Sequence, residues 1–208
     1  MKKRLIINII VISIVVILTA LCFLYDFQIV KFISYLRNSL FDSFFLGISF
    51  ASNVFIIFFF LTTLFLWKEN KGRWVVPLWI SGAISFIAGL LLKVIFRRHR
   101  PFESGEIKVL GILFNFMKNN FQTWNFSFPS FQAMFVFSAI PILNKEFGKF
   151  KYIWIVFACL VAFSRVYFGA HYLSDAIGGA IIGYLIGWFM VLIEERYEIG
   201  KKVIKNLK

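Results

Sequence analysis

Residues 74–101 read WVVPLWISGAISFIAGLLLKVIFRRHRP, and this stretch joins a long apolar run to a basic end. The run is long enough to cross the hydrocarbon core of a bilayer, for which a helix needs about 20 apolar residues. Basic side chains then gather between Lys93 and Arg100, and Pro101 marks the end of the helix, because the residue before a proline disfavours helical geometry. The stretch predicts a membrane-spanning helix with a cationic cluster at one end.

The composition of the whole chain supports a bilayer environment. Its 208 residues are 60% hydrophobic and 20% aromatic, with 29 Phe, and only 16% are charged. Soluble domains contain about 45–50% apolar and about 25% charged residues. The composition therefore excludes a soluble globular domain, and with it disorder, collagen and a coiled coil.

The charge and the reactive residue types exclude several kinds of partner. The formal net charge is +13, but the basic residues lie in short clusters between apolar runs, so no nucleic acid partner is expected. Cys22 and Cys159 lie inside apolar runs, which argues against a disulfide framework. His99 and His171 are the only two histidines, too few for a metal site with several His ligands. We expect neither a metal nor another cofactor.

Apolar runs of span length recur along the chain and predict the fold class. They fall at residues 5–24, 42–67, 74–96, 128–143, 152–168 and 173–193. The first run is as long as a full span and no cleavage site follows it, so we interpret it as an uncleaved helix and not as a signal peptide. The prediction is an all-α integral membrane protein of six transmembrane helices, forming a single domain over residues 1–208.

The positions of the basic clusters predict the orientation. With the N-terminus in the cytoplasm, most Lys and Arg residues fall in cytoplasmic turns or at the two termini, as the positive-inside rule requires. We therefore expect a multi-pass protein of the inner (plasma) membrane with both termini cytoplasmic.

Two segments fit neither a span nor a tight turn. Residues 28–41 carry polar residues at helical spacing, which predicts a short amphipathic helix in the outer interface after the first span; a plain connector packed on the bundle is the alternative. The segment 102–127 is longer than a simple connecting loop, and we expect it to dip into the headgroup layer or to form a lid.

Three polar clusters lie at the same predicted outer surface, where charged residues are costly and tend to be functional. The first contains Lys93 and Arg100. The second, around Pro129 and Ser130, is typical of a helix N-terminus, whose free N–H groups can bind an anion. The third runs from Ser164-Arg165 to His171 and Asp175, and the spacing of four residues would place imidazole and carboxylate on one helical face.

These clusters, in this order, resemble the motifs of the type 2 phosphatidic acid phosphatase (PAP2) superfamily. The matching patterns are K-x6-R-P, P-S and S-R-x5-H-x3-D, over residues 93–175. The resemblance implies that His171 is a nucleophile that forms a phosphohistidine and that Asp175 orients it. It also implies that Lys93, Arg100 and Arg165 hold the phosphate together with Ser130, without a metal.

The second motif departs from the family pattern at two positions. The second motif usually continues Gly-His, with the His protonating the leaving group, whereas this chain has Phe131 and Gln132. Glutamine cannot donate a catalytic proton. Either the leaving group needs little protonation or another residue, with His99 as the candidate, acts as the acid.

The sequence therefore predicts a membrane lipid phosphatase whose partners are the bilayer and a phosphorylated lipid, with an active site facing the periplasm or outside. A lipid without a strongly basic leaving group is favoured, and lipid A 1-phosphate is the leading candidate. Undecaprenyl diphosphate and phosphatidylglycerol phosphate are alternative substrates. A phosphotransferase and an inactive lipid-binding homologue are alternative functions.

Overall fold

A computed structural model describes residues 21–67, 72–105, 107 and 126–206 of the chain. Within these ranges the ordered elements are helices and no strand is present, in agreement with the predicted all-α class. Residues 21–35 are helical. The remaining helices are α2 (Ser39–Ala51), α3 (Val54–Trp67), α4 (Val75–Phe96), α6 (Phe131–Glu146), α7 (Phe150–Tyr167), α8 (Leu173–Tyr197) and α9 (Ile199–Asn206), with short 3-10 helices η1 (Gly72–Trp74) and η2 (Pro101–Ser104).

The described residues account for three to four membrane spans. The helices containing α4, α7 and α8 are each long and apolar enough to cross a bilayer, and α2 with α3 adds a fourth if the bent pair is one span. Helix α6 has only 16 residues, and most of the expected first span at 5–24 lies outside the described residues. The prediction of six spans is therefore not confirmed.

The run at 42–67, predicted as one helix, is broken. Helices α2 and α3 meet at an angle of 61° across Ser52 and Asn53. The Asn53 carboxamide oxygen accepts a hydrogen bond from the Phe55 N–H (3.0 Å), so a side chain starts α3 where a continuous helix would need a backbone carbonyl.

The bounds of the predicted interfacial helix at 28–41 are wrong. Residues 28–35 continue the helix that already includes 21–27, and residues 39–41 belong to α2. The reason is Asn38, which caps α2 by accepting a hydrogen bond from the Phe41 N–H at 3.0 Å. The predicted lid at 102–127 lies mostly outside the described residues.

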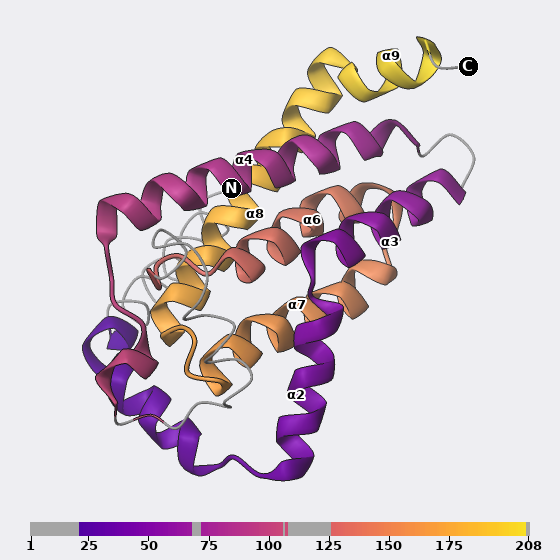
Figure 1. Cartoon of the computed structure of the whole chain (residues 1–208). Helices are drawn as coiled ribbons and strands as arrows, with labels where there is room; N and C mark the ends of the chain where they lie inside the picture. The colour runs from indigo at the N-terminus through magenta and orange to yellow at the C-terminus, as the bar shows by residue number, and fades with distance from the viewer. Residues whose placement is uncertain (1–20, 68–71, 106, 108–125, 207–208) are drawn as a thin grey trace, which may run out of the picture.

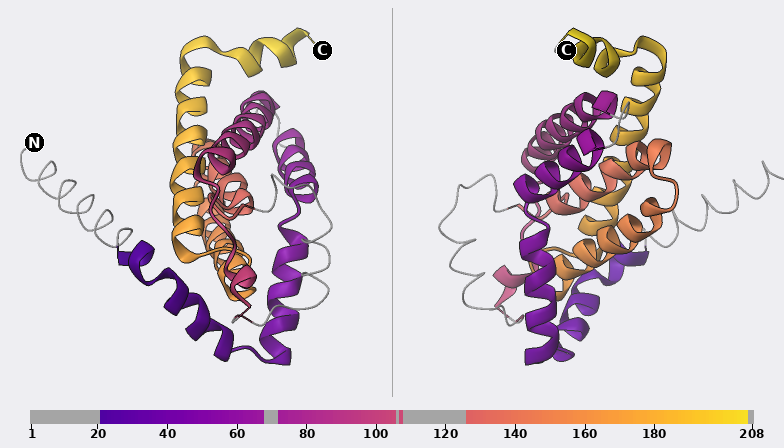
Figure 2. Two further views of the ribbon diagram at one scale, coloured as in Figure 1. Left: turned by 60° about the vertical axis from the view of Figure 1, so that its left-hand side comes forward. Right: turned by 90° about the vertical axis from the view of Figure 1, so that its right-hand side faces the viewer.

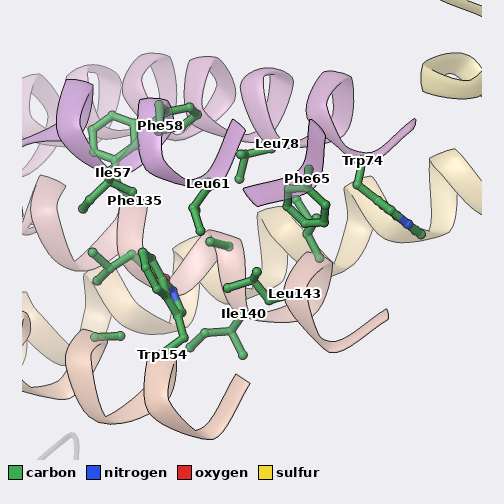
Figure 3. Close-up of a cluster of buried hydrophobic side chains, with 14 of the residues drawn as sticks. Ile57, Phe58, Leu61, Phe65, Trp74, Leu78, Phe135, Ile140, Leu143 and Trp154 are labelled. Carbon is green, nitrogen blue, oxygen red and sulfur yellow. The ribbon is translucent and has the colours of Figure 1, made fainter. Parts of the chain in front are cut away.

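The core of the bundle lies between α3, α4, α6 and α7, where large apolar side chains interdigitate (Figure 3). Leu61 and Phe65 of α3, Leu78 of α4 and Leu143 of α6 are all fully buried there. The Trp154 indole N–H of α7 donates to the Val136 carbonyl of α6 (2.8 Å), which satisfies the polar atom of this buried ring.

Helix α8 lies directly against the backbone of α6. A Cβ at Gly183 would come within 2.1 Å of the Met134 carbonyl oxygen, and one at Gly187 within 2.0 Å of the Ser138 oxygen. Small residues at every fourth position allow such close helix approach in membranes. The contact continues to Gly179, beside the Ser130 backbone, and so fixes the start of α6 against the start of α8.

The helix ends that carry the three polar clusters meet at one end of the bundle. Figure 1 shows the C-terminal ends of α4 and α7 on the same side as the N-terminal ends of α6 and α8. The helical segment 21–35 lies at this end too, whereas α9 lies at the opposite end (Figure 2).

Candidate active site

Helix α4 supplies the first basic residues of the site. Lys93 is fully buried in its last turn, and α4 ends at Phe96, where Arg97 takes a left-handed conformation. Arg100 follows in extended geometry, as expected before Pro101. Lys93 and Arg100 therefore do not share a helical face; the extended segment returns Arg100 to the site.

The N-terminus of α6 supplies buried hydroxyl groups. Ser130 is the N-cap residue, and its N–H donates to the Asp175 carbonyl at 3.1 Å. The hydroxyl oxygens of Ser130 and Ser127 are both buried, and neither has a hydrogen-bond partner among the residues that the structure describes. Because buried polar atoms are nearly always paired, these two hydroxyls indicate a place for a ligand.

A tight turn after α7 presents the third cluster. The Arg165 carbonyl accepts hydrogen bonds from the N–H groups of Ala170 (3.0 Å) and His171 (3.2 Å). Gly169 has a φ of 67°, the left-handed conformation that commonly ends a helix at a glycine. The turn reverses the chain within a few residues and brings His171 back beside Arg165.

The His171 ring is held by a backbone carbonyl. Its Nδ1 lies 2.7 Å from the Ser127 oxygen, whereas the Asp175 carboxylate is 3.8 Å away, beyond hydrogen-bond distance. Since a carbonyl oxygen only accepts, Nδ1 carries the proton and Nε2 keeps its lone pair. That Nε2 lies 3.4 Å from an Arg100 guanidinium nitrogen.

The surroundings of His171 keep its ring neutral. Burial, reinforced by the Arg100 guanidinium, lowers the pKa of His171 to about 3. Burial also lowers the pKa of Arg100, to about 10, which leaves the guanidinium charged at neutral pH. The result is an unprotonated nitrogen beside a fixed positive charge.

Two of the buried basic side chains have no carboxylate partner in the described part of the chain. Lys93 donates to the Phe126 carbonyl, and Arg165 donates to the hydroxyls of Ser49 and Ser164. A buried cation is stable only when it is paired. An anion bound between Lys93, Arg100 and Arg165 would supply the missing negative charge.

Asp175 is bound on both of its oxygens by groups other than His171. One oxygen accepts from the Tyr172 N–H (2.8 Å) at the start of α8, and the other from Arg98 (2.8 Å). Arg98 also pairs with Asp26 of the helical segment 21–35, at 2.7 Å. The sequence leaves Arg98 open between a solvent or headgroup contact and a catalytic role, and it gives no sign of Asp26, because neither the spacing nor a motif connects residue 26 to the third cluster.

The structure does not bring His99 into the site. Its side chain is 83% exposed, and Nδ1 lies 2.7 Å from a Glu103 carboxylate oxygen. Gln132 is half-buried in the first turn of α6, two residues after Ser130. The described residues contain no group of three or more His, Cys, Asp or Glu that could hold a metal ion.

This chain is similar to known proteins over a region that includes all three polar clusters. A family model described as PAP2 superfamily matches residues 74–198. An undecaprenyl-diphosphatase of Sulfolobus acidocaldarius is 29% identical over 153 residues, which cover 71% of this chain and 68% of that protein. A phosphatidylglycerophosphatase B of Bacillus subtilis is 32% identical over 83 residues, 35% of this chain and 41% of that protein.

Two solved membrane proteins share the fold. LpxE of Aquifex aeolicus matches with a TM-score of 0.61 and 23% identity, over 80% of this chain and 94% of that one. The first transmembrane PAP2 type phosphatidylglycerolphosphate phosphatase from Bacillus subtilis matches with a TM-score of 0.64 and 21% identity, over 91% and 96%. At these identities the likeness concerns the fold alone.

Proposed function

The chain belongs to the PAP2 superfamily, and from this premise we propose that it is a membrane phosphatase that releases phosphate from a lipid through a phosphohistidine at His171. One observation carries the proposal. A neutral, buried imidazole directs its free Nε2 toward Arg100. Two basic side chains beside it, Lys93 and Arg165, have no carboxylate partner among the described residues, which suits a phosphate ester better than a neutral substrate.

The first step forms a bond between His171 Nε2 and phosphorus while the bond from phosphorus to the lipid oxygen breaks. As Nε2 gives up its lone pair, positive charge develops on the ring, and the Ser127 carbonyl on Nδ1–H and the nearby Asp175 carboxylate stabilise it. Water then attacks the phosphohistidine, which releases phosphate and restores the neutral ring.

The basic side chains act on the phosphate oxygens. Lys93, Arg100 and Arg165 neutralise the charge that the three equatorial oxygens carry in the transition state. The buried hydroxyls of Ser127 and Ser130 and the N–H groups at the start of α6 donate to the same oxygens. These groups make a divalent metal unnecessary, so we propose a metal-independent reaction.

Gln132 restricts the substrate class. A general acid contributes about 10²–10⁴ in rate, and most when the leaving oxygen is strongly basic. With Gln132 in the family's acid position and His99 exposed, neither of these two side chains protonates the departing oxygen, and the site residues described above include no other candidate acid. We therefore propose a substrate with a weakly basic leaving group, which is an anomeric sugar oxygen or a phosphate.

Two lipids satisfy this requirement. In lipid A 1-phosphate the leaving group is an anomeric sugar oxygen. In undecaprenyl diphosphate, attack on the terminal phosphorus expels undecaprenyl monophosphate. The undecaprenyl-diphosphatase relative favours the second, because that match covers most of both chains. Phosphatidylglycerol phosphate would expel a basic alkoxide, and its named relative matches only 35% of this chain.

We further propose that the site opens to the outer side of the inner membrane and that both termini are cytoplasmic. The clusters lie at one end of the bundle (Figure 1). The lysine-rich α9 lies at the other end (Figure 2), which the positive-inside rule assigns to the cytoplasm.

A panel of lipids with the purified protein in detergent tests the proposal. We expect phosphate release from undecaprenyl diphosphate or lipid A 1-phosphate, and a kcat/KM at least about 10²-fold lower on phosphatidic acid and phosphatidylglycerol phosphate. In Gln132→His the difference in kcat/KM between the two groups of lipids should become smaller. A wild-type preference for phosphatidic acid would contradict the leaving-group argument. Labelled phosphate recovered on a second lipid would show a transferase, and no release at all would show an inactive homologue.

A further inference from the structure

Arg98 lies at the centre of a buried network that joins three parts of the chain. One guanidinium nitrogen donates to the Ser174 hydroxyl (2.6 Å) and to Asp175 (2.8 Å), and the other donates to Asp26 (2.7 Å). The guanidinium also lies 4.1 Å from the centre of the Tyr172 ring and 5.2 Å from that of Phe23. The guanidinium is therefore held by two carboxylates, a hydroxyl and two aromatic rings, although the side chain is 24% exposed.

Asp26 binds the start of α8 as well as Arg98. Its carboxylate accepts from the Ser174 N–H (3.0 Å) and from the Ser174 hydroxyl. The first N–H groups of a helix have no partner within the helix, and a carboxylate there is favourable. Asp26 is only 2% exposed, and Asp175 is fully buried.

We propose that Asp26 is a positioning residue of the active site, which through Arg98 and Ser174 holds Asp175 and the turn carrying His171 in their catalytic geometry. The inference rests on the proposed function. It also makes the helical segment 21–35 part of the site, although residue 26 lies outside the region 74–198 that matches the family.

The energetics of buried charge support a role in geometry. Taking ions out of water costs about as much as their attraction returns, so a buried ion pair contributes little net stability. Such a pair does impose direction: Arg98 donates to Asp26 and Asp175 from opposite ends of one rigid plane. Without Asp26, one end of that plane loses its acceptor, and Asp175 is left as the only carboxylate bound to Arg98 in the described part of the chain.

Asp26→Asn removes the charge with little change in shape, and Asp42→Asn is its matched control. Asp42 is also a carboxylate near this end of the molecule and interacts with Arg37 (3.5 Å) and Tyr167 (2.8 Å), but it has no contact with the network of Arg98. With the preferred lipid we expect Asp26→Asn to lower kcat about 10- to 100-fold, the range seen when a residue that orients a metal ligand is replaced, with KM nearly unchanged. Asp42→Asn should keep wild-type kcat.

A double-mutant cycle separates positioning from general loss of packing. If Asp26 acts through Arg98, the double variant Asp26→Asn with Arg98→Gln should show a fold-decrease in kcat much smaller than the product of the fold-decreases of the two single variants. A double variant whose fold-decrease in kcat equals that product would overturn the inference, as would a wild-type kcat in Asp26→Asn. Should Asp26→Asn not fold, Ser174→Ala keeps both charges and removes the shared hydroxyl; a normal kcat there would equally overturn it.

A second readout does not depend on turnover. In a His99→Gln background, the imidazole nitrogen resonances of His171 should shift in Asp26→Asn and stay in place in Asp42→Asn. Unshifted resonances in both would overturn the inference even if the wild type released no phosphate. An inactive wild type, in contrast, would contradict the proposed function alone.

Discussion

Acidification provides a sharp test of the neutral His171. The residue lies in the turn between α7 and α8, and burial together with the Arg100 guanidinium lowers its pKa to about 3. At pH 5 an ordinary imidazole of pKa about 6.5 is about 97% protonated. With the pKa that the structure gives, protonation at pH 5 is on the order of 1%.

The measurement is a nitrogen NMR titration of the imidazole in His99→Gln, where His171 is the only histidine. We expect one protonated nitrogen, Nδ1, and one unprotonated nitrogen, Nε2, from pH 8 down to pH 5. The denatured protein serves as the control and should titrate near pH 6.5. Protonation of both nitrogens of the folded protein between pH 6 and 7 would refute the reasoning.

The same shift links stability to pH. Because the folded pKa lies below the unfolded value, the unfolded state binds more protons between them. The contribution of His171 to stability is therefore complete above about pH 6.5 and is lost progressively as the pH falls toward about 3. His171→Gln should remove this part of the pH dependence in chemical unfolding.

Three further outcomes follow from the packing, the chemistry and the orientation. Gly183→Ala places a methyl group 2.1 Å from the Met134 oxygen and should cost about 1–3 kcal/mol in unfolding, whereas Gly47→Ala in α2, with nothing within 4 Å, should be neutral or stabilising. Phosphate release should survive EDTA, and a loss restored by Mg²⁺ or Zn²⁺ would count against a cradle made of basic side chains. In a cysteine-free background, an impermeant thiol reagent should label Ser104→Cys in intact cells and Lys201→Cys only after permeabilisation; the reverse pattern would invert the topology.

The sequence predicted the parts of the site that local chemistry determines. The order of apolar runs indicated helices, and the charged residues at their ends indicated which ends meet. Lys93 and Arg165 do lie in the last turns of α4 and α7, and Arg100 and His171 lie 3.4 Å apart in the segments that follow those helices. The spacing of His171 and Asp175 suggested a shared helical face, but α8 begins only at Leu173, and Asp175 instead caps its first turn.

Tertiary contacts between distant segments were beyond sequence reasoning. The partner of His171 Nδ1 is a backbone carbonyl, and because every residue has one, the sequence cannot indicate which carbonyl it is. Asp26 meets Arg98 only because the helical segment 21–35 returns to the start of α8. The break at Asn53 did leave a local signal, because the polar pair Ser52-Asn53 interrupts the apolar run and Asn is a common N-cap residue, but the run was interpreted as one helix.

The central claim is that His171 Nε2 takes the phosphate from the lipid, and trapping the covalent intermediate tests it most directly. Undecaprenyl diphosphate or lipid A 1-phosphate, radiolabelled in the phosphate to be released, is mixed with the enzyme and quenched in alkali within one turnover. A phosphohistidine resists alkali and is cleaved by acid. We predict alkali-stable, acid-labile label on the peptide containing His171 in the wild type and none in His171→Ala. Label on another residue, or normal phosphate release by His171→Ala, would contradict the account.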